Sequence, residues 1–318
     1  MPIRRDTRSL MASGTALTPM AFVRAIALAY RSRGQDPSGA LKVAQITPTQ
    51  LKKPAARITA AQMEAVSGHA MRELNDESLG WSRRPLPWGS YGMLIRASLS
   101  APTLGVALKR WCRHHGLICD SVALRVELHP QGACVVLQEC QPMGELREFC
   151  MVSVLRNLHG VACWLIDSRL ALQGAEFPFA RPAHADVYPT IFPGPVVFRP
   201  ATEEPAQGRL WLDARYLDLP IRRDEKALRQ LLQRALPLTV MPYRRDRLLL
   251  AQARQALLGR PEAGRSAVDL AGLLNLSVRT LHRQLKEEGT SLQAIKDEVR
   301  RERAQELLQR NRQPLKQV

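Results

Sequence analysis

The sequence predicts an α+β protein: a mixed α/β N-terminal domain followed by an all-α C-terminal domain. Residues 121–128 alternate between apolar and polar side chains, as in a strand with one buried face. From Arg223 onward, every periodic segment has the spacing of a helix. At 318 residues the chain is long enough for two domains, and "LPLTVMP" (236–242) interrupts the helical pattern between them. We place a basic tail at 1–15 and the domains at 16–236 and 237–318.

The N-terminal domain is expected to begin with helices. The first takes Thr18 as its N-cap and ends at Gly34. The second starts at Thr59, where Gln62 three residues later completes a capping box. A third runs from about 102 to 115. These helices precede the sheet in the sequence.

The strands follow the third helix. Residues 121–128 ("SVALRVEL") and 133–139 ("ACVVLQE") are joined by "HPQG" at 129–132, which suits a type I turn, so we predict a β-hairpin. "PVVF" (195–198) and "RLWL" (209–212) are further short strands.

A long helix is expected at 146–168. Its apolar residues occur almost all round rather than on one stripe. A helix of this kind is either buried in its own domain or covered by a second subunit. It is therefore our candidate for the contact surface of a homodimer.

The charge predicts an anionic partner. The net charge is +17 and the pI is near 10.4, which points to a nucleic acid or an anionic membrane surface. Residues 240–318 carry 16 Lys and Arg against 9 Asp and Glu, so the C-terminal domain is the more basic per residue. "AFVRAIALAY" and the apolar run at 151–166 are both broken by Arg or His, so we expect a cytoplasmic protein with no membrane partner.

The six cysteines all lie between Cys112 and Cys163. In "WCRHHGLIC", Cys112, His114, His115 and Cys119 invite comparison with a metal site, but the spacing fits no standard zinc pattern. A helix running into a strand is the better interpretation. We expect no metal and no cofactor.

Two short helices and a tight turn are predicted at 266–289. Ser266–Leu274 is the first helix. Asn275 follows it and tolerates the left-handed conformation that ends a helix. Ser277 is a good N-cap for the second helix, Ser277–Glu288, which Gly289 closes. This arrangement predicts a helix–turn–helix.

The second helix has two unlike faces. Leu281 and Leu285 are four residues apart and face inward. Arginine is well shaped to bridge guanine O6 and N7, and the start of a recognition helix reaches base edges. A plain solvated helix face is the alternative. Four residues that can donate hydrogen bonds share the opposite face: Arg279, His282, Arg283 and Lys286.

A long helix is expected to follow, capped by Thr290 with Gln293 and ending near 309. It carries "RRER" at 300–303. Arg300 and Arg301 are expected to touch phosphates, which adds affinity without sequence information. Alternatively, the arginines pair only with the neighbouring acids Glu298, Glu302 and Glu306. Our candidates for contacts to the DNA backbone are Ser277, Thr280, Lys286, Arg300 and Arg301.

Residues 269–308, "DLAGLLNLSVRTLHRQLKEEGTSLQAIKDEVRRERAQELL", resemble the first half of an AraC/XylS-family DNA-binding domain. "SAPTLGVALKRW", "VYPTIFPGPVVF" and "LWLDARYLDLPI" resemble the arabinose-binding-type effector domain of the branch that contains ornithine-utilisation regulators. The resemblance implies a transcription regulator whose first domain senses a small molecule and dimerises. It also implies that Arg279, His282 and Arg283 are the candidate base readers.

The family domain has two helix–turn–helix units. "QPLKQV" (313–318) resembles the entry to the second unit, after which the sequence stops. We therefore expect this chain to carry an incomplete reader.

The leading hypothesis is a DNA-binding transcription regulator controlled by a small-molecule effector. The alternative is a small-molecule receptor with an incomplete, non-functional DNA reader. We expect no catalysis, because no nucleophile motif, phosphate loop or zinc pair is present. Expected partners are double-stranded DNA, a second copy of the chain and an unknown effector; RNA polymerase is a candidate partner. The positive charge slightly favours an anionic effector. Trp81, Trp88 and Tyr91 either line its pocket or anchor a loop to the core.

Overall fold

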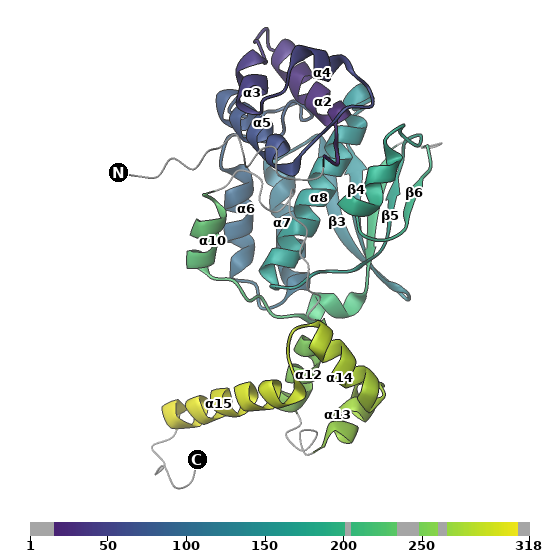
Figure 1. Cartoon of the computed structure of the whole chain (residues 1–318). Helices are drawn as coiled ribbons and strands as arrows, with labels where there is room; N and C mark the ends of the chain where they lie inside the picture. The colour runs from purple at the N-terminus through teal and green to yellow at the C-terminus, as the bar shows by residue number, and fades with distance from the viewer. Residues whose placement is uncertain (1–15, 201–204, 234–247, 260–265, 311–318) are drawn as a thin grey trace. The chain divides into compact units, whose positions relative to one another are not determined.

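The computed structural model describes residues 16–200, 205–233, 248–259 and 266–310. The chain divides into two compact units, Met1–Tyr243 and Arg244–Val318 (Figure 1). The N-terminal unit contains two sheets with helices, whereas the described part of the C-terminal unit is helical throughout. The α+β fold class is therefore confirmed. The expected tail (1–15), the expected boundary (236–242) and 313–318 lie outside the described residues.

The main sheet has five strands in the order β3-β4-β7-β5-β6. β3 (Val122–His129) and β4 (Gly132–Glu139) form the predicted antiparallel hairpin. β7 (Gln207–Leu212) lies antiparallel between β4 and β5 (Leu172–Phe177). β6 (Val196–Phe198) adds a parallel edge strand. The hairpin, β6 and β7 were predicted, and β5 was not.

The missed strand has an irregular register. Its pairing with β7 shifts between Leu172 and Gly174, which places an extra residue in the strand. Leu172, Ala175 and Phe177 are its buried residues, so the buried positions do not keep a spacing of two. A bulge of this kind hides a strand from a search for alternation.

Helix α8 (Arg147–Leu165) forms the centre of the N-terminal unit. Fifteen of its 19 residues are buried. It lies directly against β7, since a Cβ added at Gly208 would be 3.2 Å from Leu155 Cδ1 and 3.3 Å from Met151 Sδ. Burial in its own domain is thus the correct interpretation. Its assignment as a homodimer surface was wrong, because the apolar residues of the helix are buried within the domain itself and the four remaining residues are only partly exposed.

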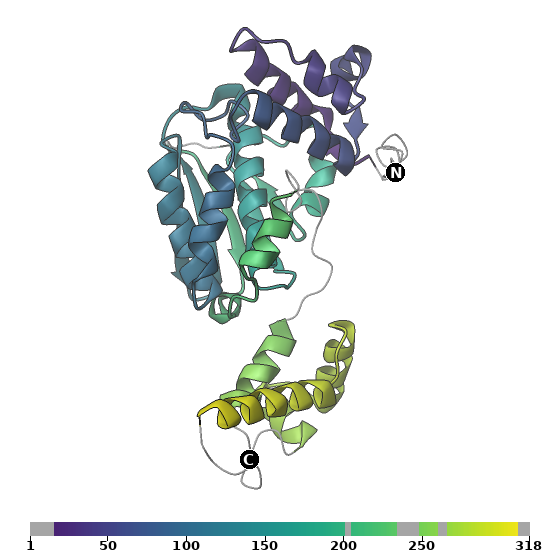
Figure 2. The same cartoon turned by 90° about the vertical axis from the view of Figure 1, so that its left-hand side faces the viewer.

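Two further helices follow outward from α8, the first against α8 and the second against the first. α7 (Leu104–Ile118) contacts β3 and α8, and α6 (Ser90–Leu99) packs on α7 (Figure 2). α7 corresponds to the predicted third helix, capped by Thr103. Shorter elements complete the unit: η1 (Gly144–Leu146), η2 (Ala185–Val187), α9 (Tyr188–Ile191), η3 (Ala214–Asp218) and α10 (Glu225–Leu231).

A small helical group forms the start of the N-terminal unit (Figure 1). The predicted capping box of its last helix is present: Thr59 Oγ1 accepts from Gln62 N at 3.2 Å, and Gln62 Oε1 accepts from Thr59 N at 3.1 Å. The elements of the group are β1 (Thr18–Pro19), α2 (Met20–Arg31), α3 (Ser38–Val43), α4 (Pro48–Lys52), β2 (Arg57–Ile58) and α5 (Ala60–Glu73).

The predicted N-cap of the first helix was wrong. Thr18 pairs with Ile58 in the two-stranded β1–β2 sheet, and α2 begins only at Met20. The amide of Met20 donates to the carbonyl of Ala56 at 3.0 Å. This long-range contact takes the place of a local cap.

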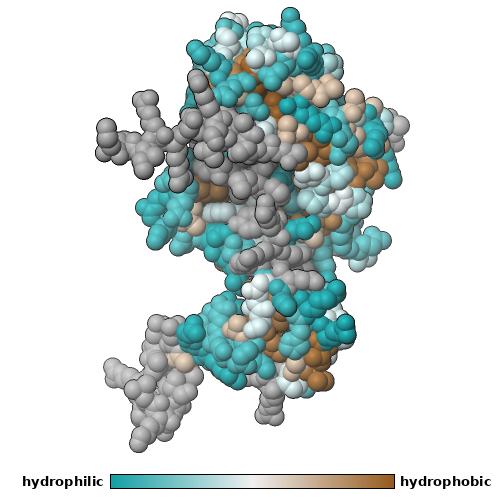
Figure 3. Space-filling model, in the orientation of Figure 1, coloured by the Kyte–Doolittle hydropathy of each residue, from teal (hydrophilic) through white to brown (hydrophobic). Residues whose placement is uncertain are grey.

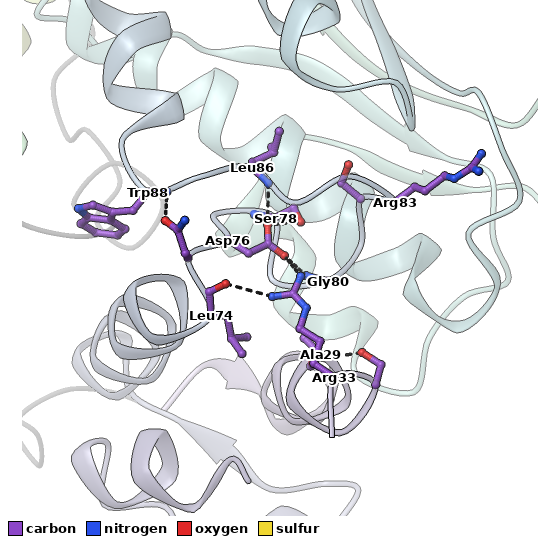
Figure 4. A network of polar contacts seen from close by, with 12 residues as sticks. Ala29, Arg33, Leu74, Asp76, Ser78, Gly80, Arg83, Leu86 and Trp88 are labelled. Atoms are coloured by element: carbon purple, nitrogen blue, oxygen red, sulfur yellow. Dashed lines mark hydrogen bonds and ion pairs between the residues drawn. The ribbon is translucent and has the colours of Figure 1, made fainter. Parts of the chain in front are cut away.

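The loop between α5 and α6 is held by one carboxylate (Figure 4). Asp76 is fully buried. Its Oδ1 accepts from the amide and hydroxyl of Ser78 at 2.9 and 2.6 Å and from Leu86 N at 2.9 Å. Its Oδ2 accepts from Gly80 N at 3.1 Å and forms an ion pair with Arg33 of α2. Both oxygens are therefore satisfied, and the loop is tied to α2.

The next residue along the chain caps α6. Glu77 accepts hydrogen bonds from Gly89 N and Tyr91 N, both at 2.7 Å. Trp81 is buried and Trp88 is exposed, with the Arg72 guanidinium 4.7 Å from its ring centroid. The sequence did not predict α6, because its capping carboxylate is distant in the chain.

Four helices make up the described C-terminal unit: α12 (Leu248–Gly259), α13 (Ala267–Leu273), α14 (Val278–Glu287) and α15 (Leu292–Arg310). α12 contacts each of the other three. The buried core consists of Leu249, Ala253, Leu257, Leu270, Ala271, Leu281, Leu285, Leu292, Ile295 and Val299.

On the face of the molecule in Figure 3, hydrophilic residues cover much of the surface and hydrophobic residues form separate patches. Among the described residues, no helix combines the length and apolarity that a membrane span requires. Within the same residues, no group of three His, Cys, Asp or Glu side chains could hold a metal ion.

Candidate nucleic-acid interface

The first helix of the candidate interface ends as the sequence predicts, and its N-cap is Ser266, for which no capping role was predicted. Ser266 Oγ accepts from Asp269 N at 3.1 Å at the start of α13. At its end, Asn275 adopts a φ of 54°, the left-handed conformation predicted for it. The amide of Leu276 donates to the carbonyl of Ala271 at 2.8 Å. These bonds define the turn that leads into α14.

The second helix begins and ends as predicted. Ser277 Oγ accepts from Thr280 N at 3.1 Å, so Ser277 is the N-cap of α14. Gly289, with a φ of 80°, follows the helix. The helix–turn–helix geometry predicted for 266–289 is therefore present in this unit.

The inner face of α14 fixes how the helix is rotated. Leu281 and Leu285 have no exposed surface. They belong to the same apolar core as Leu270 and Ala271 of α13 and Ala253 of α12. Burial of two leucines contributes roughly 3–6 kcal/mol. Rotation about the helix axis would expose them, so the opposite face is held toward solvent.

The outer face is basic. Successive residues are about 100° apart around a helix, so four exposed residues that can donate hydrogen bonds share one sector about 100° wide on the side away from the two leucines. No acidic residue of α14 lies inside that sector, and Glu287 lies about 40° beyond its edge at Arg283. Its members, all exposed, are Arg279, His282, Arg283 and Lys286. The structure thus brings together all three candidate base readers and one of the candidate backbone contacts.

Two other candidate backbone contacts lie at the start of α14. The hydroxyl groups of Ser277 and Thr280 are 2.8 Å apart and bonded to each other. Ser277 is exposed, and Thr280 is half-buried. Thr280 lies about 100° from Leu281 and about 60° from Arg283, on the flank between the buried leucines and the basic sector. Ser277 is the better placed of the two for a phosphate.

The acidic residues of α15 do not all form the ion pairs with neighbouring arginines that the alternative interpretation expects. Glu298 and Glu302 form ion pairs with Arg254 of α12, the first at 3.7 Å. Arg300 pairs with Asp297 at 3.5 Å, and both side chains are largely exposed. An exposed pair of this kind contributes about 0–1 kcal/mol. Arg300 therefore keeps its guanidinium accessible to a phosphate.

Arg301 is exposed and forms no ion pair with any residue that the structure describes. Of its three expected acidic neighbours, two face α12, and the side chain of Glu306 lies outside the described part of the chain. Arg300 and Arg301 belong to α15, so they are a separate group from the basic face of α14.

The predicted cap of α15 was wrong by one residue. Ser291 Oγ, rather than Thr290, accepts from the helix, from Ala294 N at 3.2 Å. Gln293 instead donates to Asp297 Oδ1 at 2.8 Å. Thr290 N is bonded to the carbonyl of Leu285 at 2.9 Å, which still belongs to the end of α14.

Sequence reasoning missed one residue that positions α14. The Glu288 carboxylate accepts from Leu249 N at 3.1 Å and from Leu250 N at 2.8 Å. It therefore satisfies the first amides of α12 from the end of α14, where a negative charge suits the positive end of a helix. No local signal could have indicated this contact, because its two sides lie 38–39 residues apart.

The second helix of the helix–turn–helix has a basic outer face, and the chain also contains a separate α/β unit. These two features define the class of protein: a helix–turn–helix protein with an additional α/β domain. The chain belongs to the AraC transcription regulators. Residues 34–221 match the family described as the arabinose-binding domain of AraC transcription regulator, N-terminal. This match covers more than half of the chain and lies within the N-terminal unit. The protein is therefore a transcription regulator.

The chain is also similar to two individual proteins. The chain is 25% identical over 305 residues to the ornithine utilization regulator of Pseudomonas aeruginosa, an alignment that covers 95% of this chain and 88% of the relative. It is similar at 20% identity to the crystal structure of the transcriptional regulator CdpR from Pseudomonas aeruginosa, with 90% of this chain and 87% of that chain covered and a TM-score of 0.34.

Proposed function

We propose that this regulator reads a DNA major groove with α14 and is controlled by a small-molecule effector bound in the N-terminal unit. Arg279, His282 and Arg283 are the base readers. Ser277, Thr280, Lys286, Arg300 and Arg301 contact the sugar–phosphate backbone. The observation that carries the proposal is the basic outer face of α14, which the two buried leucines hold toward solvent.

The chemistry of this face supports base reading. An arginine can donate two hydrogen bonds to guanine O6 and N7, which discriminates a G·C pair in the major groove. Arg279 and Arg283 are four residues apart, so one helix turn separates them and both can reach the same groove. His282 lies between them as a smaller hydrogen-bonding group.

The expected partners are a second copy of the chain and a small-molecule effector. A single small module buries little surface on DNA, so two chains bound as a dimer would multiply the contacts. The effector assignment draws on the match of the N-terminal unit to an arabinose-binding domain and on the name of the relative, an ornithine utilization regulator. Homodimerisation and a contact with RNA polymerase remain predictions, as does location in the cytoplasm.

The test is a selection of duplexes from a random DNA pool with the full chain, followed by gel-shift titration at two salt concentrations. We expect binding that weakens steeply with salt, because each phosphate contact releases counterions. The control is a variant with Arg279, His282 and Arg283 all replaced by alanine, which should retain no sequence preference. Absence of a shift at low salt would contradict the proposal and favour a receptor without a working DNA reader.

A further inference from the structure

Helix α7 carries buried polar groups that have no hydrogen-bond partner. Trp111 is 2% exposed and His115 is 0% exposed. Within the described residues, Trp111 Nε1 and both ring nitrogens of His115 are unpaired. The two residues are four apart, so they lie on the same side of α7. Buried side-chain polar atoms are paired in the large majority of cases, so three on one helix face need an explanation.

A third aromatic side chain lies against both. The ring of Tyr91, from α6, is stacked on Trp111 with centroids 5.9 Å apart, and its centroid is 6.1 Å from that of His115. Tyr91 is half-buried, and burial raises its pKa well above the ordinary value. We call Tyr91, Trp111 and His115 the α6–α7 site.

The site is held in place by the loop that precedes it. Glu77 accepts the amide of Tyr91 at 2.7 Å and so fixes the first turn of α6. Asp76 fixes the loop itself to α2, as the network in Figure 4 shows. Tyr91 therefore has a defined position opposite α7. Binding sites are typically placed on rigid supports of this kind.

The groups of the site are uncharged. Burial lowers the pKa of His115 from its ordinary 6.5 to about 4, so its imidazole is neutral near pH 7. A neutral imidazole presents one N–H donor and one acceptor nitrogen, and the indole of Trp111 presents one donor. An anionic ligand buried against these groups would lose its hydration without meeting a positive charge, which is costly. A cationic ligand would lie near Glu77, whose carboxylate is already bonded to the amides of Gly89 and Tyr91.

We propose that the α6–α7 site binds the effector, and that the effector is a small uncharged molecule with an amide or hydroxyl group and an apolar part. Its polar group accepts from Trp111 Nε1 and bonds to His115, while its apolar part lies against the Tyr91 ring. The inference rests on the proposed function only in calling this molecule the effector. It differs from the anionic effector that the net charge favours, and it gives a role to the Trp111–Cys119 segment.

Three probes that share one ring and differ in charge test the ligand class: benzamide, benzoate and benzylammonium. The full chain is labelled with ¹⁵N at its tryptophan indoles. It has five tryptophans, and the Trp111→Phe variant identifies the Trp111 signal. Trp211 is the internal control, because its indole already donates to Glu176 at 3.1 Å.

We expect benzamide to shift the Trp111 indole signal saturably and to leave that of Trp211 unchanged. Benzoate and benzylammonium should bind at least about tenfold more weakly. If none of the three shifts the Trp111 signal, the site holds water only and the proposal is overturned. Equal binding of the charged probes would overturn the assigned ligand class.

Two variants separate a binding role from a packing role. Tyr91→Phe keeps the ring contacts and loses the hydroxyl, so it should still bind benzamide. That result would show that a substitution in the site does not by itself abolish binding. His115→Phe removes the unpaired nitrogens. It should weaken benzamide about tenfold while leaving the melting temperature of the ligand-free chain unchanged or higher. A large loss of melting temperature with unchanged benzamide binding would make His115 a packing residue and overturn its role.

These measurements contain no DNA. Failure of the proposed DNA reading would appear in the gel shift alone, and failure of the α6–α7 site would appear in the indole spectrum alone.

Discussion

Helices α14 and α7 display their polar side chains in opposite ways. α14 buries two leucines and turns Arg279, Arg283 and their neighbours toward solvent. α7 buries Trp111 and His115 without hydrogen-bond partners among the described residues. Water can hydrogen-bond to the exposed side chains of α14 at no cost to stability. The buried nitrogens of Trp111 and His115 stay without a hydrogen-bond partner until a ligand or water enters. We therefore expect the α14 face to gain affinity from charge and the α6–α7 site to gain affinity from desolvated hydrogen bonds.

Replacing Leu281 by alanine should have the largest effect on the first region. The side chain is fully buried, so we expect a loss of about 2–5 kcal/mol in the unfolding free energy of the C-terminal unit. Chemical denaturation of the full chain, followed by circular dichroism, measures it. Leu273→Ala is the matched control, because Leu273 is exposed. Equal losses in the two variants would mean that the inner face does not orient α14.

Acid should destabilise the second region. Because burial lowers the pKa of His115 from 6.5 to about 4, the unfolded chain takes up a proton in this range while the folded chain does not. This group therefore has no effect on the pH dependence above pH 6.5, and it lowers the unfolding free energy as the pH falls from 6.5 toward about 4. The loss is on the order of 3 kcal/mol. Buried His159, whose pKa is also lowered to about 4, acts in the same direction.

Denaturation midpoints measured between neutral pH and about pH 4 test this. His115→Phe should flatten the dependence, and Tyr91→Phe, which keeps the His115 imidazole and its neighbouring ring, should not. A His115→Phe variant with the same acid sensitivity as the parent would show that the imidazole is not shielded from water.

Arg283 and Arg301 should differ in what they contribute to DNA binding. Arg283→Ala should cost about 1–3 kcal/mol on the preferred sequence and relax the preference at one base pair. Arg301→Ala should weaken all sequences about equally and reduce the salt slope by about one. Titrations on selected and scrambled duplexes measure both. Identical effects on sequence preference would refute the division of roles.

Glu288→Gln should have the smallest effect. The amide keeps an acceptor for Leu249 N or Leu250 N but loses the charge at the start of α12, so we expect a loss of about 0.3–1 kcal/mol. The control is Gln255→Glu, at an exposed position of α12 beyond its first turn, where a change of charge does not act on the start of the helix. Denaturation of the C-terminal unit at low and high salt measures both, and a loss in Glu288→Gln that salt does not reduce would argue against the dipole explanation.

The sequence predicted the orientation of α14 because the signals that determine it lie within a short segment of the chain. Ser277 as the cap, Asn275 in the turn and the spacing of Leu281 and Leu285 are local signals, and the structure bears out each one. The fold class, the hairpin and the Thr59 capping box follow from equally local patterns.

The α6–α7 site could not be predicted in the same way. Tyr91 and His115 come from two helices, and α6 was itself missed because Glu77 caps it from a distance. The segment "WCRHHGLIC" has Cys and His residues that invite comparison with a metal site. Only the fold shows that Trp111 and His115 are buried in the interior. The error at Thr18 has a related cause, since the bond from Met20 N to the distant Ala56 carbonyl takes the place of the expected cap. The error at Thr290 is local, because the neighbouring Ser291 is the cap instead.

The loop beside this site also limits how the protein can be engineered. Replacing a loop glycine by alanine is a common way to stiffen a chain, but it fails where φ is positive. Gly80 has a φ of 86°, and an added Cβ would come within 2.7 Å of the Cβ of Ala29. A methyl group there would push the loop away from α2 and strain the Arg33–Asp76 pair. Stabilising designs must therefore leave position 80 as it is and choose exposed helix positions instead.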